Sequence, residues 1–300
     1  MFNNMTPKQA MFGGAITALI MGGFIVLSRF GVRDVFNEAD LTLFRYLSGL
    51  ILLPLFLRLD LKTLGGIGWQ RAIVLTICAG WPFNLFIMNG FNYAPAAHGA
   101  VFGPGTMPMF TAILSWIVLD DRPGVYRLSG LIAITAGLLM MGWGGFLESP
   151  PGAWIGDLYF LGGAALWAGF TVAVRRWGID PAEAVAVVGV LSLVSFIPVY
   201  STFYENVFLT AGLADLSLQI FYHGFLVGIV GVLFFAGGIQ VLGPTKIALF
   251  ISLVPVFGTL MGIPILNELP GRLETLGIII VVLGMLAAMG VRPGMIFNGR

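Results

Sequence analysis

The stretch GPGTMPMFTAILSWIVLDDRPGVYRLSG, from Gly103 to Gly130, decides the fold because a related stretch occurs later in the chain. Each copy has an apolar run interrupted by glycine and proline, then a short charged turn (Asp120–Pro123 or Asn267–Pro270), then a second apolar run. At a shift of 147 positions, Pro108, Phe110, Leu119, Pro123, Gly124, Gly130 and Gly137 correspond to Pro255, Phe257, Leu266, Pro270, Gly271, Gly277 and Gly284. The chain is therefore predicted to be a duplication of a hydrophobic unit.

The amino-acid composition is typical of a membrane protein. Of its 300 residues, 58% are hydrophobic and 10% charged, whereas a soluble domain has about 25% charged residues. Its 42 glycines would each cost about 1 kcal/mol in a soluble helix. The net charge of +1 comes with no basic stripe, which a nucleic-acid partner would require. We therefore expect a polytopic membrane protein with no nucleic-acid partner.

Ten runs are long enough to span a bilayer, which takes about 20 apolar residues as a helix. A helix is favoured there because it satisfies its own backbone polar groups. The predicted fold is an all-α integral membrane protein with short connections. The ten runs are Met11–Val32, Leu41–Leu59, Ala72–Asn92, Ala96–Leu119, Val125–Phe146, Ile155–Val174, Ala182–Phe203, Ile220–Leu242, Thr245–Leu266 and Leu273–Val291. The connection Tyr204–Gln219 is expected to lie on the membrane surface.

The distribution of lysine and arginine predicts the orientation. With ten spans, eleven of these residues lie on the side shared by both termini, and only Arg29, Arg33 and Arg272 lie on the other side. Since cytoplasmic loops carry the excess of positive charge, both termini are predicted to be cytoplasmic, in a cell inner membrane. The loops around Glu148 and Glu205, which have no cation, fit the outside.

The duplication predicts two inverted halves, residues 11–146 and 155–291. Each unit has five spans, an odd number, so the second unit enters the membrane from the opposite side. Inverted repeats with discontinuous helices are typical of secondary transporters, whose substrate site lies near the midplane between the halves. We therefore expect a central cavity.

Prolines and glycines predict where the helices break. Gly103, Pro104, Gly105 and Pro108 should interrupt the fourth span, because each proline removes a helical N–H and clashes with the preceding turn. Pro255 marks the ninth span more mildly. Carbonyls freed at such a break must be satisfied by protein or by cavity water. We therefore expect the substrate to bind near Phe102–Pro108.

A family resemblance rests on the Pro-x-Phe of each fourth helix, Pro108–Phe110 and Pro255–Phe257, and on the turn and glycine that follow. Together with the stretch Leu43–Leu47, these residues make Met11–Val291 resemble the drug/metabolite transporter superfamily, in its EamA-type branch. The chain is similar to the aromatic and hydrophobic amino-acid exporters there. The resemblance implies two five-helix repeats and export of amino acids or related metabolites. The second half has no counterpart to Arg45.

Two helix faces are candidates for substrate contact. On the third span Trp81, Asn84 and Met88 share a face, with Asn89 close by, and on the sixth span Phe160, Gly163, Trp167 and Phe170 do the same. Two aromatic faces with an amide between them suit a small zwitterion that carries an apolar side chain. The alternative is that the tryptophans pack the core and the asparagines form interhelix hydrogen bonds.

Arg45 and His98 are the candidate ionisable contacts. Arg45 either meets the substrate or extends to the interface, and His98 either responds to pH or forms a hydrogen bond at a helix start. All fourteen carboxylates fall in loops or at helix ends, which disfavours carboxylate-coupled antiport. No His-Glu-x-x-His or phosphate-binding loop is present, so we expect no metal, no cofactor, no ATP and no enzyme activity.

The resulting hypothesis is an ATP-independent exporter of small aromatic or hydrophobic amino acids by alternating access. Its partners are a small-molecule substrate and the lipid bilayer, and a homo-oligomer is left open. A carrier of other small metabolites or drug-like amines is the alternative, and a membrane enzyme or scaffold is a more distant one.

Overall fold

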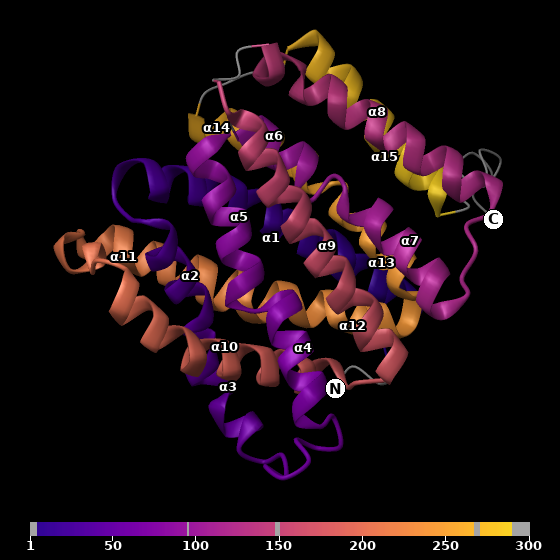
Figure 1. Ribbon diagram of the computed structural model, residues 1–300. Coiled ribbons are helices and arrows are strands. Elements are labelled where there is room, and N and C mark those ends of the chain that lie inside the picture. Colours follow the sequence, from indigo (N-terminus) through magenta and orange to yellow (C-terminus); the bar gives the residue numbers. More distant parts are fainter. Residues whose placement is uncertain (1–4, 95, 148–150, 267–270, 290–300) are drawn as a thin grey trace.

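The computed structural model describes residues 5–94, 96–147, 151–266 and 271–289, and within them it contains helices and no strands (Figure 1). The first repeat comprises α1 (Pro7–Asp34), α2 (Glu38–Tyr46), α3 (Ser48–Phe56), α4 (Trp69–Ala79), α5 (Trp81–Tyr93), α6 (Ala96–Phe102), α7 (Met107–Leu119) and α8 (Val125–Leu147). The second comprises α9 (Ala153–Trp177), α10 (Pro181–Phe203), η1 (Val207–Thr210), α11 (Leu213–Gln219), η2 (Ile220–Gly231), α12 (Val232–Leu242), α13 (Pro244–Ile251), α14 (Val254–Leu266) and α15 (Arg272–Ala288). The expected all-α class is confirmed.

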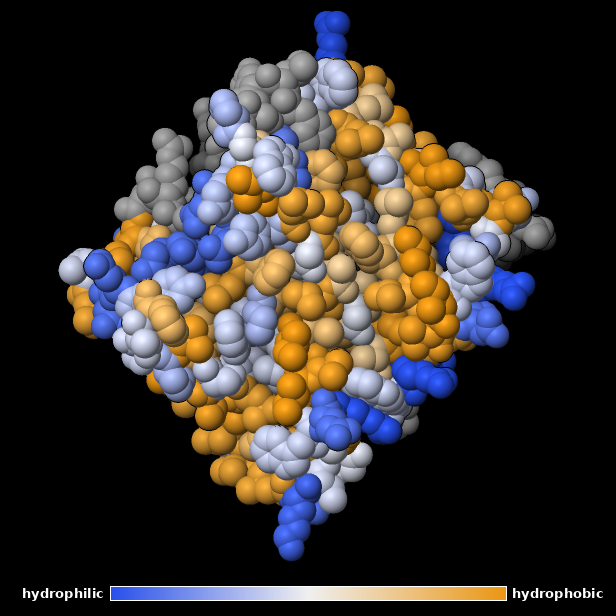
Figure 2. Space-filling model, in the orientation of Figure 1, coloured by the Kyte–Doolittle hydropathy of each residue, from blue (hydrophilic) through white to orange (hydrophobic). Residues whose placement is uncertain are grey.

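Among the described residues, nine segments have the length and composition of membrane spans. The tenth predicted span corresponds to α15, whose described helix has 17 residues. Apolar side chains cover much of the face shown in Figure 2, and hydrophilic ones gather toward its edges. The eighth span differs from the prediction, because α11 continues into η2 and the apolar segment starts at Leu213 rather than Ile220. The last seven residues of the expected surface segment, Leu213–Gln219, are therefore part of this span.

The two repeats pack against each other symmetrically, which is consistent with inverted copies. In the first repeat α1 packs against α12 and α14 of the second, and in the second repeat α9 packs against α5 and α7 of the first. The two arrangements correspond when the repeats are exchanged. Each repeat therefore inserts its first helix against the third and fourth spans of the other.

The repeated glycines form the contact between α8 and α15, which lie side by side along one edge of the molecule (Figure 1). A Cβ on Gly137 would lie 2.8 Å from the Gly277 carbonyl oxygen, and one on Gly284 would lie 2.9 Å from that of Gly130. Small residues allow helices to approach closely in a bilayer, where packing rather than hydrophobicity drives their association. The glycines that reveal the duplication in the sequence thus join the two repeats.

Both fourth spans are broken. Residues 103–106 separate α6 from α7, and Ser252–Leu253 separate α13 from α14. Pro108 and Pro255 each occupy the second position of the helix that follows, where a missing N–H costs no helical hydrogen bond. The second span is also interrupted, at Leu47, and the third at Gly80. These last two breaks were not predicted from the sequence.

We predict that Gly137→Ala destabilises the protein. The new methyl group would meet backbone atoms of Gly277 and Val281 at less than 3.0 Å, and overpacking of this kind costs about 1–3 kcal/mol. The melting temperature of the purified protein in detergent should fall. Gly124→Ala is the control, because a Cβ there meets nothing within 4 Å. Equal melting temperatures for the two variants would contradict the assignment.

Candidate functional site

A cavity of about 50 Å³ lies between the two repeats. The first repeat contributes α1, α2, α5, α6 and α7, and the second contributes α9, α13 and α14. Both broken fourth spans reach it. Its lining residues are Met21, Phe24, Ile25, Arg45, Phe83, Ile87, Phe91, Gly99, Pro104, Met107, Trp167, Ile251 and Val254. Since sites that bury a drug-sized ligand have about 300–1,000 Å³, this conformation is contracted around the site.

Arg45 places a positive charge in this apolar wall. Its side chain is 3% exposed, and its Nη1 donates a hydrogen bond of 3.1 Å to Oδ1 of Asn84. Asn84 is fixed in turn, since its Nδ2 donates to Oγ1 of Thr42 at 2.8 Å. The guanidinium carbon lies 5.5 Å from the ring centre of Phe24 and 5.6 Å from that of Phe83. Arg45 therefore faces the cavity and does not extend to the interface.

The charge of Arg45 lacks an anionic partner among the described residues, where the ion pairs are His98–Asp157 and Arg127–Asp121. A charged side chain at the bilayer centre costs about 2.5–3.5 kcal/mol on insertion scales. Cation–π contacts recover about 0.5–2 kcal/mol, and the neutral amide of Asn84 adds one hydrogen bond. The guanidinium of Arg45 is therefore a buried positive charge that no anion balances among the described residues.

Trp167 supplies the opposite wall. The indole is 3% exposed and packs against Phe83, Phe170 and Phe235 with ring centres 5.1–5.5 Å apart. Its Nε1–H has no hydrogen-bond partner among the described residues. A buried donor left unpaired costs about 1–3 kcal/mol. The wall thus combines a large apolar surface with one available donor.

The other residues that the sequence proposed as substrate contacts lie outside the lining of this cavity. Asn84 holds Arg45, and Phe170 packs behind Trp167. Met88 is fully buried in the core, and Nδ2 of Asn89 donates to Leu85 of its own helix. Trp81 donates to Ser195 and stacks on Phe196 of α10, and Phe102 packs near His98. On α5 the residues that line the cavity are Phe83, Ile87 and Phe91, one position away from the face proposed from the sequence.

The break between α6 and α7 borders the cavity through Pro104 and Met107. Several of the carbonyls near it are satisfied locally: Gly105 N–H donates to Ala100 at 3.1 Å, and the hydroxyl of Thr106 donates to Phe102 at 2.7 Å. Gly103 N–H likewise donates to Gly99 at 2.9 Å. The break therefore forms part of the cavity wall, and the hydrogen bonds of a short turn join α6 to α7.

One end of the bundle, the acidic face, carries residues 35–37 and 204–212. Here three polar contacts join the repeats: the hydroxyl of Tyr200 donates to Oδ1 of Asp40, Nδ2 of Asn37 donates to the Glu205 carbonyl oxygen at 3.0 Å, and Nδ1 of His98 lies 2.7 Å from Oδ1 of Asp157. We call these the acidic-face contacts. Each pairs a residue of the first repeat with one of the second, so together they join the repeats at this end.

His98 was a candidate from the sequence, but its partner Asp157 and the separate pair of Asp40 and Tyr200 were not. Asp40 is fully buried and Tyr200 is 5% exposed, although both lie near the ends of apolar spans. Asp40 also accepts from the N–H of Asn37 in a capping box. The capping box is a local sequence pattern, and it explains why a carboxylate lies at this helix start. It does not predict the contact with Tyr200, which is 160 residues away.

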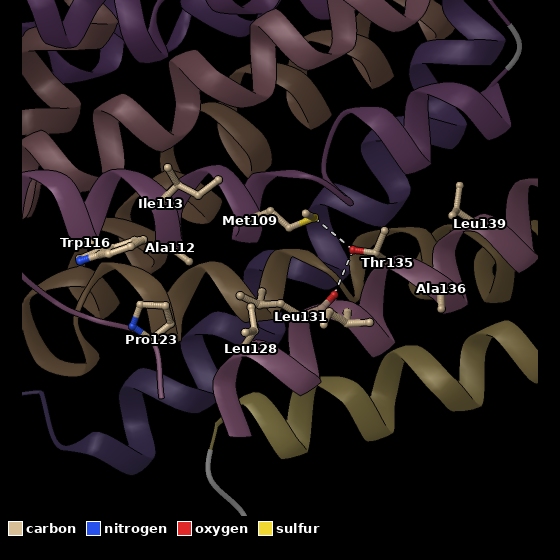
Figure 3. Close-up of a pocket in the computed structure, with 11 residues that line it drawn as sticks. Met109, Ala112, Ile113, Trp116, Pro123, Leu128, Leu131, Thr135, Ala136 and Leu139 are labelled. Atoms are coloured by element: carbon tan, nitrogen blue, oxygen red, sulfur yellow. Dashed lines mark hydrogen bonds between the residues drawn. The ribbon is translucent and has the colours of Figure 1, made fainter. Parts of the chain in front are cut away.

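A second hollow of about 470 Å³ lies between α7 and α8 (Figure 3). Its lining includes the exposed side chains of Ile113, Trp116 and Ile132. The hydroxyl of Thr135 is already engaged, since it donates to the Leu131 carbonyl oxygen and to the sulfur of Met109. This groove suits lipid chains and offers no group to recognise a charged substrate. Among the described residues no cluster of His, Cys, Asp or Glu has the form of a metal site.

The fold and cavity define a membrane transporter with inverted repeats. The chain belongs to the EamA-like transporter family, whose model matches residues 8–143 and 154–290. It is 29% identical over 227 residues to the uncharacterized transporter YyaM of Bacillus subtilis, covering 73% of this chain and 72% of that protein. It is 23% identical over 278 residues to an uncharacterized transporter of Archaeoglobus fulgidus, covering 90% and 94%. A solved crystal structure superposes with a TM-score of 0.76 at 18% identity, covering 94% of this chain and 96% of that one.

We predict that Tyr200→Phe loosens the acidic face. The variant keeps the ring but removes the hydroxyl that donates to Asp40, and a hydrogen bond to a charged group contributes about 1.5–3 kcal/mol. In a Cys78→Ser background, a membrane-impermeant maleimide supplied at this face should label Phe91→Cys about tenfold faster when Tyr200→Phe is added.

Tyr204→Phe is the matched control for that experiment. Tyr204 stacks on Tyr200, and no hydrogen bond joins its hydroxyl to Asp40. Labelling should stay within twofold of the background. If Tyr200→Phe left the labelling rate unchanged, the contact would not hold the acidic face closed.

Proposed function

We propose that this transporter is a secondary carrier that exports small aromatic or hydrophobic amino acids through the cavity between its repeats. The observation that carries the proposal is the buried guanidinium of Arg45, which has no anionic partner among the described residues and lies in an aromatic wall. A substrate carboxylate would supply the missing charge, and an apolar side chain would fit against Phe83 and Trp167.

The contracted cavity and the acidic-face contacts support alternating access. About 50 Å³ does not hold an amino acid, so binding requires the walls to separate. The repeats meet in equivalent ways through α1 and α9, and inverted halves that exchange conformations open a central site to each side in turn.

A carrier of drug-like amines is the alternative, and the site disfavours it. Arg45 would repel a cation at the point of binding, and no Asp or Glu is among the cavity-lining residues. A substrate with only a positive charge would therefore meet repulsion without compensation.

The acidic face is proposed to lie outside the cell inner membrane, with both termini in the cytoplasm. The excess of Lys and Arg on the opposite side supports this orientation. The maleimide experiment tests it in intact cells, because a reagent added outside reaches Phe91→Cys in the Tyr200→Phe variant only if the acidic face is external.

We predict that the purified protein in liposomes catalyses counterflow of labelled tryptophan and phenylalanine, with slower counterflow of threonine and none of a quaternary amine. Arg45→Gln should lower phenylalanine counterflow by about 10- to 100-fold, because a charge-assisted hydrogen bond of about 1.5–3 kcal/mol is lost. Trp167→Phe should lower it by a smaller factor, because only the indole N–H is removed.

Arg58→Gln is the control, since Arg58 is an exposed arginine beyond the end of α3. Melting temperatures of all variants would separate loss of binding from loss of fold. Absence of flux for every amino acid would refute the proposed substrate, and an Arg45→Gln variant with normal flux would remove Arg45 from the site.

A further inference from the structure

His223 is a buried polar residue that the proposed carboxylate site leaves unused. It lies on η2, is 0% exposed, and neither of its ring nitrogens has a hydrogen-bond partner among the described residues. An apolar side chain would fill the same space without an unpaired donor or acceptor. Buried polar groups are normally hydrogen-bonded, so an unpaired one calls for an explanation.

His223 lies directly behind the cavity wall. Its ring centre is 5.0 Å from that of Phe24, and Phe24 both lines the cavity and contacts the guanidinium of Arg45. Since a substrate must displace the contracted walls, Phe24 is among the side chains that would have to move. His223 is the polar group that its movement would uncover.

The backbone fixes His223 relative to Arg45. The segment η2 is wound as a π-helix, a rare form that is often found at functional sites. Gly224 and Gly228 bring it against α2: a Cβ on them would lie 2.9 Å from the Phe44 carbonyl oxygen and 2.7 Å from that of Arg45. The imidazole and the guanidinium therefore belong to one packed unit.

The two groups have complementary chemistry. Arg45 and the indole of Trp167 only donate hydrogen bonds, whereas a neutral imidazole also offers one acceptor nitrogen. An imidazole buried without a counter-ion is neutral. A zwitterionic amino acid needs an acceptor for its ammonium group as well as donors for its carboxylate, and His223 is placed to provide that acceptor.

We propose that His223 accepts a hydrogen bond from the amino group of the substrate and thereby selects amino acids over carboxylates that lack the amine. This assignment rests on the proposed function, because it presupposes that Arg45 binds the carboxylate. It makes His223 a specificity-determining residue of the second repeat, packed against the same Phe24 ring as Arg45 of the first.

The test compares the binding of labelled phenylalanine and of 3-phenylpropionate, which lacks the amine, to purified protein. The wild type should bind phenylalanine at least tenfold more tightly. His223→Leu should weaken phenylalanine binding about tenfold and leave 3-phenylpropionate within twofold. His223→Asn, whose amide retains an acceptor, should keep most of the preference for phenylalanine.

Tyr222→Phe is the control for a purely structural effect. Its hydroxyl donates to the Ile20 carbonyl oxygen at 2.8 Å and anchors the same segment to α1, so its loss should change the binding of both ligands by the same factor. Equal losses for both ligands in His223→Leu, or no loss, would overturn the role of His223.

The outcomes also separate this inference from the proposed function. A wild-type protein that binds the two ligands equally well would overturn the role of His223 and leave the carboxylate site intact. A wild-type protein that binds neither would refute the proposed substrate class. If His223→Leu does not fold, the wild-type ligand ratio and His223→Asn still decide the question.

Discussion

The burial of the Arg45 guanidinium in an apolar wall is the constraint on which the site depends. A hydrogen bond to Asn84 and the rings of Phe24 and Phe83 hold the charge at the cavity, yet they do not neutralise it. An ionisable residue inside a membrane segment is costly and usually functional. The proposal that a substrate carboxylate binds here rests on this charge, on the aromatic wall and on the small volume of the cavity.

The architecture is symmetric where the repeats join and asymmetric where the substrate is proposed to bind. Gly137 and Gly284 occupy equivalent positions and pack α8 against α15 from both sides. The cavity takes Arg45 from the first repeat and Trp167 from the second. The proposed mechanism therefore uses the symmetry of the two halves for alternating access, and the proposed recognition uses residues that only one half carries.

Much of the fold was predictable from the sequence, because its determinants are local. Run length, the glycine repeats and Pro104 indicate spans, inversion and a broken helix directly. The face of α5 was harder to predict: its segment is apolar nearly all round, so periodicity does not distinguish Phe83 from Trp81. His223 and the Asp40–Tyr200 contact depend on residues far apart in sequence, and only the folded chain brings their surroundings together.

Arg45 is proposed to recognise the carboxylate of the substrate. Equilibrium binding of phenethylamine, which is phenylalanine without the carboxylate, tests this proposal most directly. Phenethylamine should bind at least tenfold more weakly than phenylalanine to the wild type, and Arg45→Gln should remove this difference. Equal affinities of the wild type for the two compounds would contradict it.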